Sequence, residues 1–205
     1  MLFRLDLEVL VMLLPVLVFS LVFHEFAHAW AAYRLGDPTA KNAGRLTLNP
    51  LVHLDLTGSL MILFVGFGWA KPVPVDVRRL AEPRTDMMKV AFAGPASNLL
   101  LAFLGGTVLR TTGFTGSLET VLVMFTYINI MLAVFNMIPV PPLDGSQILA
   151  GFIGQKHPAL VVKMHVYGPR VLLGLIVFGM VTDFSPLWWI MGPPAELLMA
   201  LFVGR

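Results

Sequence analysis

The stretch from Val9 to Tyr33 constrains the fold more than any other part of this sequence. It holds 25 residues, and its only charged or histidine side chains are His24, Glu25 and His28. A helix of this length, at about 1.5 Å per residue, can cross a hydrocarbon core of about 30 Å. In the whole chain 13% of the residues are charged, whereas a soluble domain usually has about a quarter. The sequence therefore predicts an integral membrane protein.

Further apolar stretches predict the remaining membrane segments. Val90–Leu109 and Thr120–Leu143 contain no charged residue and have the length of ordinary transmembrane helices. Val171–Thr182 and Leu187–Val203 predict two short, closely coupled spans. Thr57–Gly68 has 12 residues and would reach about 18 Å as a helix, so it predicts a re-entrant or β-hairpin element. The expected fold is an all-α polytopic membrane protein with about five transmembrane helices.

The basic residues predict how the chain lies in the membrane. If the N-terminus is outside and Thr57–Gly68 enters and leaves on one side, 12 of the 14 basic residues face the cytoplasm, as the positive-inside rule expects. His24 and Asp144 then reach the same cytoplasmic face, whereas a full crossing by Thr57–Gly68 would separate them. We expect residues 1–205 to form a single domain embedded in the lipid bilayer.

Two absences narrow the function. The chain has no cysteine, so any metal ion must be held by histidine, carboxylate or carbonyl groups. Its basic residues form no cluster interleaved with aromatic residues, which argues against a nucleic-acid partner.

The motif HEFAH at residues 24–28 predicts a metal site. Its two histidines stand at i and i+4, on one face of a helix and about 6 Å apart. We expect His24 and His28 to bind one Zn²⁺ ion, with Glu25 beside them as a base. The alternative is a hydrogen-bonded helix bundle without metal, but three ionisable groups within about one helical turn are costly to bury without a counter-ion.

Asp144 is the predicted third ligand, because catalytic zinc usually has three protein ligands and an open position for water. It follows the sequence NMIPVPPL, whose prolines should break the preceding span and turn the carboxylate back toward the bundle. Alternatively, Asp144 caps the helix that begins at SQIL. Four rival ligands lie in polar loops, where a solvated side chain is the ordinary expectation: His53, Asp55, His157 and His165.

Three motifs together resemble the site-2 protease family of intramembrane metalloproteases. They are HEFAH, AGPASN at residues 93–98 and NMIPVPPLDG at residues 136–145, and they occur in the family's order. The resemblance extends over roughly residues 9–151. Two further motifs resemble the compact prokaryotic branch of the family: NPLVHLD at 49–55 and FGWAKPVPV at 67–75.

The resemblance implies an intramembrane zinc metalloprotease in the inner membrane of a prokaryotic cell. Zinc ligation by His24, His28 and Asp144 and a catalytic Glu25 are implied with it. Water activated by the metal would cleave peptide bonds within or near the transmembrane segments of single-span or membrane-anchored proteins. Such a segment must unwind first, because a helix hides its peptide groups in hydrogen bonds. A homo-oligomer is also compatible with the sequence.

Two other functions use the same residues. A transporter or metal channel would place these ionisable groups along an ion pathway, and a catalytically silent membrane binding protein would retain only the fold. The channel predicts polar residues along a path through the membrane. Here they gather toward one face, which favours a reaction chamber open to one side.

Two asparagines are further expected site residues. Asn98 lies about eight residues, or about 12 Å, into its span, near the expected depth of the zinc. We expect Asn98 and Asn136 to orient a metal ligand or to donate a hydrogen bond to substrate. For Asn98 the alternative is a structural bond between helices, with Gly94 allowing their close approach.

The region Thr57–Val75 is expected to offer an edge strand to the unwound substrate. Pro72 and Pro74 would limit pairing beyond this edge, because proline lacks the backbone N–H that a sheet requires.

Overall fold

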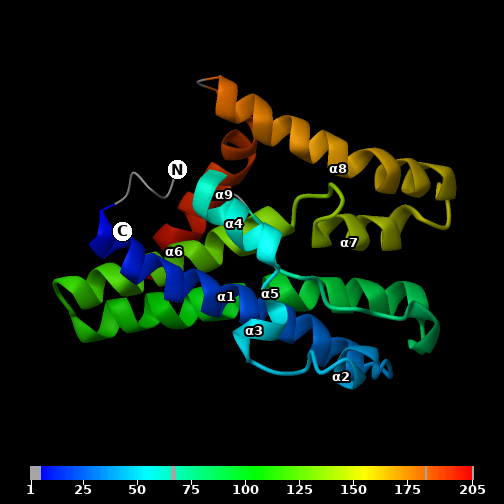
Figure 1. Cartoon of the computed structure of the whole chain (residues 1–205), viewed down its shortest axis with the longest axis horizontal. Coiled ribbons are helices and arrows are strands. Elements are labelled where there is room, and N and C mark those ends of the chain that lie inside the picture. The colour runs from blue at the N-terminus through cyan, green and yellow to red at the C-terminus, as the bar shows by residue number, and fades with distance from the viewer. Residues whose placement is uncertain (1–5, 66–67, 183, 205) are drawn as a thin grey trace.

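The computed structural model describes residues 6–65, 68–182 and 184–204. Within them, five helices are long and apolar enough to cross a membrane, which confirms the predicted all-α polytopic class. These are α1 (Leu7–Arg34), α5 (Pro83–Thr112), α6 (Ser117–Asn136), α8 (Pro158–Val181) and α9 (Pro186–Val203) (Figure 1). The shorter elements are α2 (Thr39–Asn42), α3 (Pro50–His53), α4 (Leu56–Val65), the 3₁₀ turn η2 (Val77–Arg79) and α7 (Asp144–Ile153).

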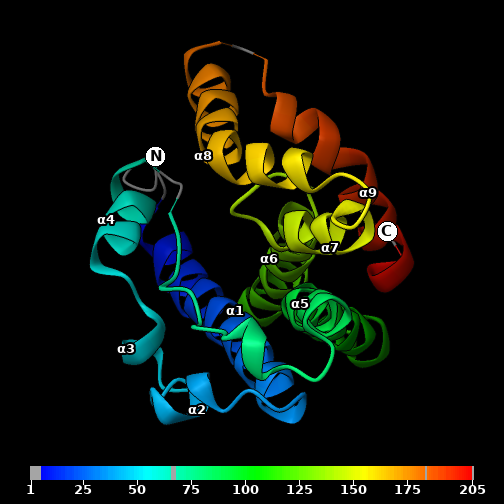
Figure 2. The same ribbon diagram turned by 90° about the vertical axis from the view of Figure 1, so that its right-hand side faces the viewer.

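Helix α5 lies at the centre of the bundle and contacts α1, α6, α7 and α9 (Figures 1 and 2). Glycines allow this close packing. A Cβ atom at Gly105 would lie 2.6 Å from Thr126 Oγ1, and one at Gly106 would lie 2.6 Å from the carbonyl oxygen of Phe202. In lipid, where no hydrophobic effect drives helices together, such close backbone approach supplies the packing contacts. The bundle of α1, α5 and α6 is therefore a firm support for side chains at its centre.

Helix α8 diverges from this bundle and contacts α9 and α7 (Figure 2). It begins at Pro158, well before the predicted start at Val171. The sequence around Gln155 to His165 predicts a polar, amphipathic stretch ahead of this span, but Lys163 and His165 are exposed side chains on early turns of the helix itself. An α-helix satisfies its own backbone hydrogen bonds whatever the polarity of its side chains, so hydropathy alone places its start too late.

Two other helix ends differ from the predicted spans by seven residues each. Helix α5 begins at Pro83, ahead of Val90, with proline in the first turn, where its missing N–H has no partner to lose. Helix α6 ends at Asn136 and not at Leu143. Three prolines in residues 139–142 end it, because each lacks an N–H donor and restricts the residue before it.

The element predicted over Thr57–Gly68 begins with a helix, α4. The chain then returns to the point from which it left: Leu54 and Ala70 form an antiparallel bridge, and the Lys71 N–H donates to the carbonyl oxygen of His53 at 2.7 Å. Both ends of the excursion therefore lie side by side. This agrees with a re-entrant element, whereas the helix rules out β-hairpin strands over residues 56–65.

The expected edge strand needs the same correction. Residues 57–65 are helical, so the described part of this region that is free of helix is 68–75. Residues 66 and 67 lie outside the described residues. Among the residues that the structure describes here, a pairing edge for a substrate is thus restricted to the returning segment 68–75.

Candidate active site

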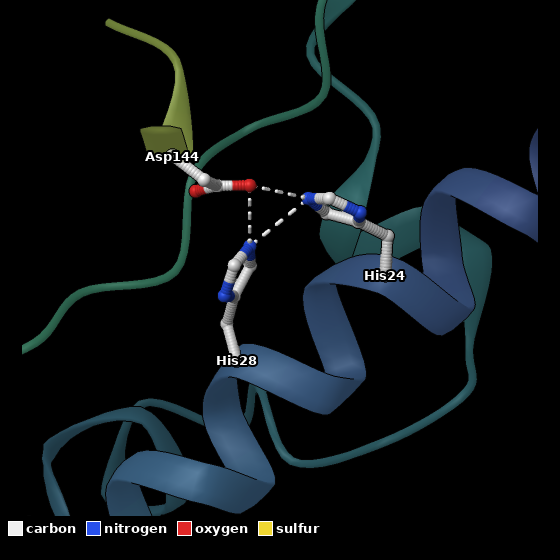
Figure 3. Close-up of side chains that lie close together, drawn as sticks. All are labelled: His24, His28 and Asp144. Carbon is white, nitrogen blue, oxygen red and sulfur yellow. Dashed lines mark hydrogen bonds and ion pairs between the residues drawn. The ribbon is translucent and has the colours of Figure 1, made fainter. Parts of the chain in front are cut away.

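Helix α1 presents two imidazole rings to the first residue of α7 (Figure 3). The Nε2 atoms of His24 and His28 are 3.0 Å apart, and Asp144 Oδ2 lies 3.1 Å from the first and 3.4 Å from the second. In tetrahedral geometry, bonds of about 2.1 Å to zinc place neighbouring ligand atoms about 3.4 Å apart. The three atoms therefore have nearly the spacing that one zinc ion requires.

The hydrogen-bond partners of the two rings decide where their protons lie. His28 Nδ1 is 2.8 Å from the carbonyl oxygen of Val90, which can only accept, so Nδ1 carries the proton. His24 Nδ1 is 2.6 Å from Asn98 Oδ1 and donates in the same way. A neutral imidazole has one protonated nitrogen, so both Nε2 lone pairs face each other and the Asp144 carboxylate. With both rings in this tautomer, three electron-rich atoms converge on one point, where a metal cation could bind all of them.

Gly94 on α5 lies directly against both rings. A Cβ atom here would be 2.6 Å from His24 Nε2 and still closer to His28 Nε2. Only a residue without a side chain allows α5 to approach α1 at this level.

The loop between α6 and α7 brings Asp144 to the histidines. Leu143 precedes α7 in an extended conformation, and Asp144 opens the helix without capping it through its side chain. A Cβ atom at Gly145 would overlap the carbonyl oxygen of Met137 and lie 2.8 Å from that of Ile138. The turn is thus packed tightly on itself, and Asp144 faces the imidazoles and does not act as a helix cap.

Glu25 stands beside the three potential ligands. Its Oε2 accepts a hydrogen bond of 3.2 Å from the backbone N–H of Val73, in the returning segment 68–75. The side chain is half-buried. In the described part of the chain, the group of side chains with metal-ligand spacing consists of His24, His28 and Asp144. Glu25 is therefore available for proton transfer.

These groups open into a cavity of about 870 Å³. Glu25, Asp144 and segment 68–75 border it, and apolar side chains of α1, α5, α6, α8, α9 and the loop before α7 form most of the remaining wall. Representative apolar residues are Leu21, Met131, Phe135, Ile176 and Met191. A cavity of this size and apolar character admits a stretch of unwound apolar chain next to a small polar centre.

Comparisons with known proteins agree with this chemistry. Residues 110–177 match the model of peptidase family M50. The chain is 41% identical over 178 residues to YwhC of Bacillus subtilis, covering 80% of this chain and 81% of that protein. It belongs to peptidase family M50. It is also 30% identical over 166 residues to Rip2 of Mycolicibacterium smegmatis, covering 77% of this chain and 63% of Rip2.

A third relative is MJ0611 of Methanocaldococcus jannaschii, 32% identical over 129 residues, or 62% of this chain and 63% of that protein. All three relatives bear the name "Putative zinc metalloprotease". No solved structure matches the chain. Family M50 comprises the site-2 proteases, so the predicted resemblance is confirmed. The chain is an intramembrane zinc metalloprotease, and the transporter and silent-binder alternatives are not favoured.

The rival ligands lie apart from the site of this M50 protease. The expectation that His53 is solvated is wrong: its side chain is buried, and Nε2 lies 2.8 Å from the carbonyl oxygen of Thr47. Asp55 accepts a 2.8 Å hydrogen bond from the N–H of Gly58 in the first turn of α4. His157 and His165 are exposed. The turn around His53 is not a loop in water, because it contacts α1 and its backbone is bonded to the returning segment at Lys71.

The two expected asparagines lie in different surroundings. Asn136 borders the cavity, and its Nδ2 donates to the carbonyl oxygen of Leu132 in its own helix at 2.9 Å. Asn98 is fully buried, is absent from the cavity wall and accepts from His24 Nδ1. Of the two roles expected for Asn98, the geometry favours orienting a ligand over contacting substrate.

Two buried polar residues next to Asn98 were not among the site residues predicted from the sequence. Ser20 lies one helical turn before His24, and Asn129 lies in the middle of apolar α6; both are fully buried. Asn129 Oδ1 accepts from Asn98 Nδ2 at 2.8 Å. A signal was present, since a polar amide within a transmembrane helix usually faces the bundle interior.

Proposed function

We propose that His24, His28 and Asp144 hold the zinc ion of this protease and that Glu25 is its general base. The convergence of two Nε2 lone pairs and a carboxylate oxygen within 3.4 Å carries the proposal. Bound there, zinc would supply a Lewis acid that makes a water molecule acidic near pH 7 and polarises a peptide carbonyl.

Glu25 performs the proton transfers. Its carboxylate takes a proton from the attacking water while the water oxygen forms a bond to the carbonyl carbon of the substrate. The carbon–nitrogen bond then breaks, and Glu25 returns the proton to the leaving amine. The bond from the Val73 N–H reaches one carboxylate oxygen, Oε2, so the other oxygen is available to the water.

The substrates are membrane proteins, and we propose that the cleaved segment enters the cavity unwound. The apolar wall formed by α6, α8 and α9 accommodates its side chains. The returning segment 68–75 borders the same cavity beside Glu25 and is the proposed edge for backbone pairing. Substrates should therefore contain residues that weaken a helix near the cut, since the peptide carbonyl must leave its helical hydrogen bond.

We further propose that the N-terminus is outside and that the active site lies toward the cytoplasmic side of a prokaryotic cell membrane. The 12 to 2 division of the basic residues supports this orientation. This topology requires the re-entrant element to enter and leave the membrane on one side, and the pairing of its ends at Leu54 and Ala70 supports this.

Cleavage of single-span model substrates by the purified protein tests the proposal. We compare wild type with Glu25→Gln and measure bound zinc in both. Cleavage should fall by a factor of about 10² to 10⁴, whereas zinc should remain bound. Equal cleavage by the variant would refute the role of Glu25. Asp144→Ala should lose zinc, and the exposed residue His165 provides the control: His165→Ala should keep both zinc and activity.

A further inference from the structure

A buried polar network joins three helices directly behind His24. Ser20 on α1, Asn98 on α5 and Asn129 on α6 are each fully buried, in helices that lie side by side (Figures 1 and 2). None of the three residues borders the cavity. The network can therefore influence the site only through the residue it contacts there, which is His24.

Backbone carbonyl oxygens fix the direction of every bond in this network. The Ser20 hydroxyl donates to the carbonyl oxygen of Val16 at 2.8 Å, so Ser20 Oγ is free to accept. Asn129 Nδ2 donates both to Ser20 Oγ at 2.9 Å and to the carbonyl oxygen of Phe125 at 2.8 Å. Because a carbonyl oxygen cannot donate, the Asn129 amide has one orientation, with Oδ1 toward Asn98.

The orientation of Asn98 follows from that of Asn129. Asn98 Nδ2 donates to Asn129 Oδ1 at 2.8 Å and to the carbonyl oxygen of Ser20 at 3.3 Å. Both of its protons are thus used, and a flipped amide would place Oδ1 against two acceptors. Asn98 Oδ1 must therefore face His24 Nδ1, and the ring must carry its proton there.

We propose that Asn129, with the help of Ser20, is a positioning residue for the zinc ligand His24. Acting through Asn98, it holds the imidazole in the tautomer and orientation that present Nε2 toward His28 and Asp144. An apolar residue could fill the same space between α1, α5 and α6, but it would let the Asn98 amide turn. The inference rests on the proposed role of His24 in binding zinc.

Zinc affinity measured by competition with a chelating dye tests this role, with KM for a model substrate as a second readout. Asn129→Leu keeps a similar volume and removes both the donor and the acceptor. Loss of a residue that orients a metal ligand typically lowers metal affinity by about 10- to 100-fold, and we expect a loss in that range. KM should stay within about twofold, because Asn129 does not touch the cavity.

Thr126 provides the matched control on the same helix. It is fully buried, and its hydroxyl donates to the carbonyl oxygen of Leu122 in its own helix at 2.8 Å. Thr126→Val should keep the zinc affinity of wild type. If it weakens zinc as much as Asn129→Leu does, the effect is general loosening of the bundle and the proposal is wrong.

Two further variants keep the inference testable if Asn129→Leu does not fold. Ser20→Ala removes one of the two acceptors that orient Asn129, so it should weaken zinc less than a change at Asn129 itself. Asn129→Asp cannot donate to the carbonyl oxygen of Phe125 and should weaken zinc strongly. Wild-type zinc affinity in a folded Asn129 variant would overturn the proposal.

His24→Ala distinguishes failure of this inference from failure of the proposed function. If His24→Ala binds zinc with full affinity, the proposed metal site is wrong. If His24→Ala loses zinc but the Asn129 variants bind it normally, the proposed metal site is supported and only the positioning role of Asn129 is refuted.

Discussion

Replacing Gly94 by alanine tests the proposed metal site at its tightest contact. The added Cβ atom would lie 2.6 Å from both Cε1 and Nε2 of His24, and closer still to His28 Nε2. Ordinary van der Waals contact begins at 3.4 Å. The His24 ring would therefore have to retreat by about 0.8 Å (3.4 − 2.6), and the His28 ring by more.

Neither ring is free to make this movement. Each ring is tied to α5 by a hydrogen bond at Nδ1. His24 bonds to Asn98 at 2.6 Å, and His28 bonds to the carbonyl oxygen of Val90 at 2.8 Å. If α5 moves away from α1 instead, the same two bonds lengthen, since both acceptors belong to α5. Zinc sites tolerate ligand displacements of about 0.2 Å, and an error of about 1 Å in an active site can reduce the rate about 10²-fold.

We therefore expect Gly94→Ala to lower zinc affinity and to reduce kcat/KM by at least about 10²-fold. Chelator competition measures the first quantity and cleavage of a single-span substrate the second. Gly174→Ala is the matched control, because Gly174 is an exposed glycine of α8 with no atom within 4 Å of an added Cβ. A folded Gly94→Ala protein with wild-type zinc affinity and cleavage would refute this account of the site.

Three further predictions concern the surroundings of the site. Gly145→Ala should weaken zinc at least about 10-fold, because its Cβ would overlap the carbonyl oxygen of Met137 and displace Asp144; zinc titration of the folded variant measures this. His53→Ala should lower the free energy of unfolding by about 1–3 kcal/mol, through loss of the bond to Thr47, and leave zinc content unchanged. Treatment of wild type with a chelator should abolish cleavage, and added zinc should restore it.

The helices that carry the chemistry could be predicted because their patterns are local. The two histidines of HEFAH share a face through helical spacing alone, and the long apolar run around them indicates a membrane helix. The meeting of Asp144 with the histidines was also predicted, from the parity of the spans. That argument needed Thr57–Gly68 to return to one side, and the bridge between Leu54 and Ala70 agrees with it.

The errors arose where tertiary contacts override local composition. The hydropathy of a 12-residue apolar stretch is the same whether it folds as a hairpin or as a helix. Packing in the folded protein selects the helix α4. The polar start of α8 concealed the helix between Pro158 and the predicted start at Val171. His53 has the sequence surroundings of a solvated loop, yet its side chain is buried, and no local pattern records this burial.

One face of α5 explains why the two histidines can serve as a pair. Three residues of this face, spaced four apart, contact the histidines. Val90 contacts His28, Gly94 lies against both rings, and Asn98 contacts His24. Since α5 runs antiparallel to α1, the two sets match position by position. Val90 holds His28 through its backbone carbonyl, so another apolar residue there should preserve this bond. Gly94 is required because it has no side chain, and Asn98 is required because its side chain accepts the bond from His24. At these two positions of this face the site depends on residue identity.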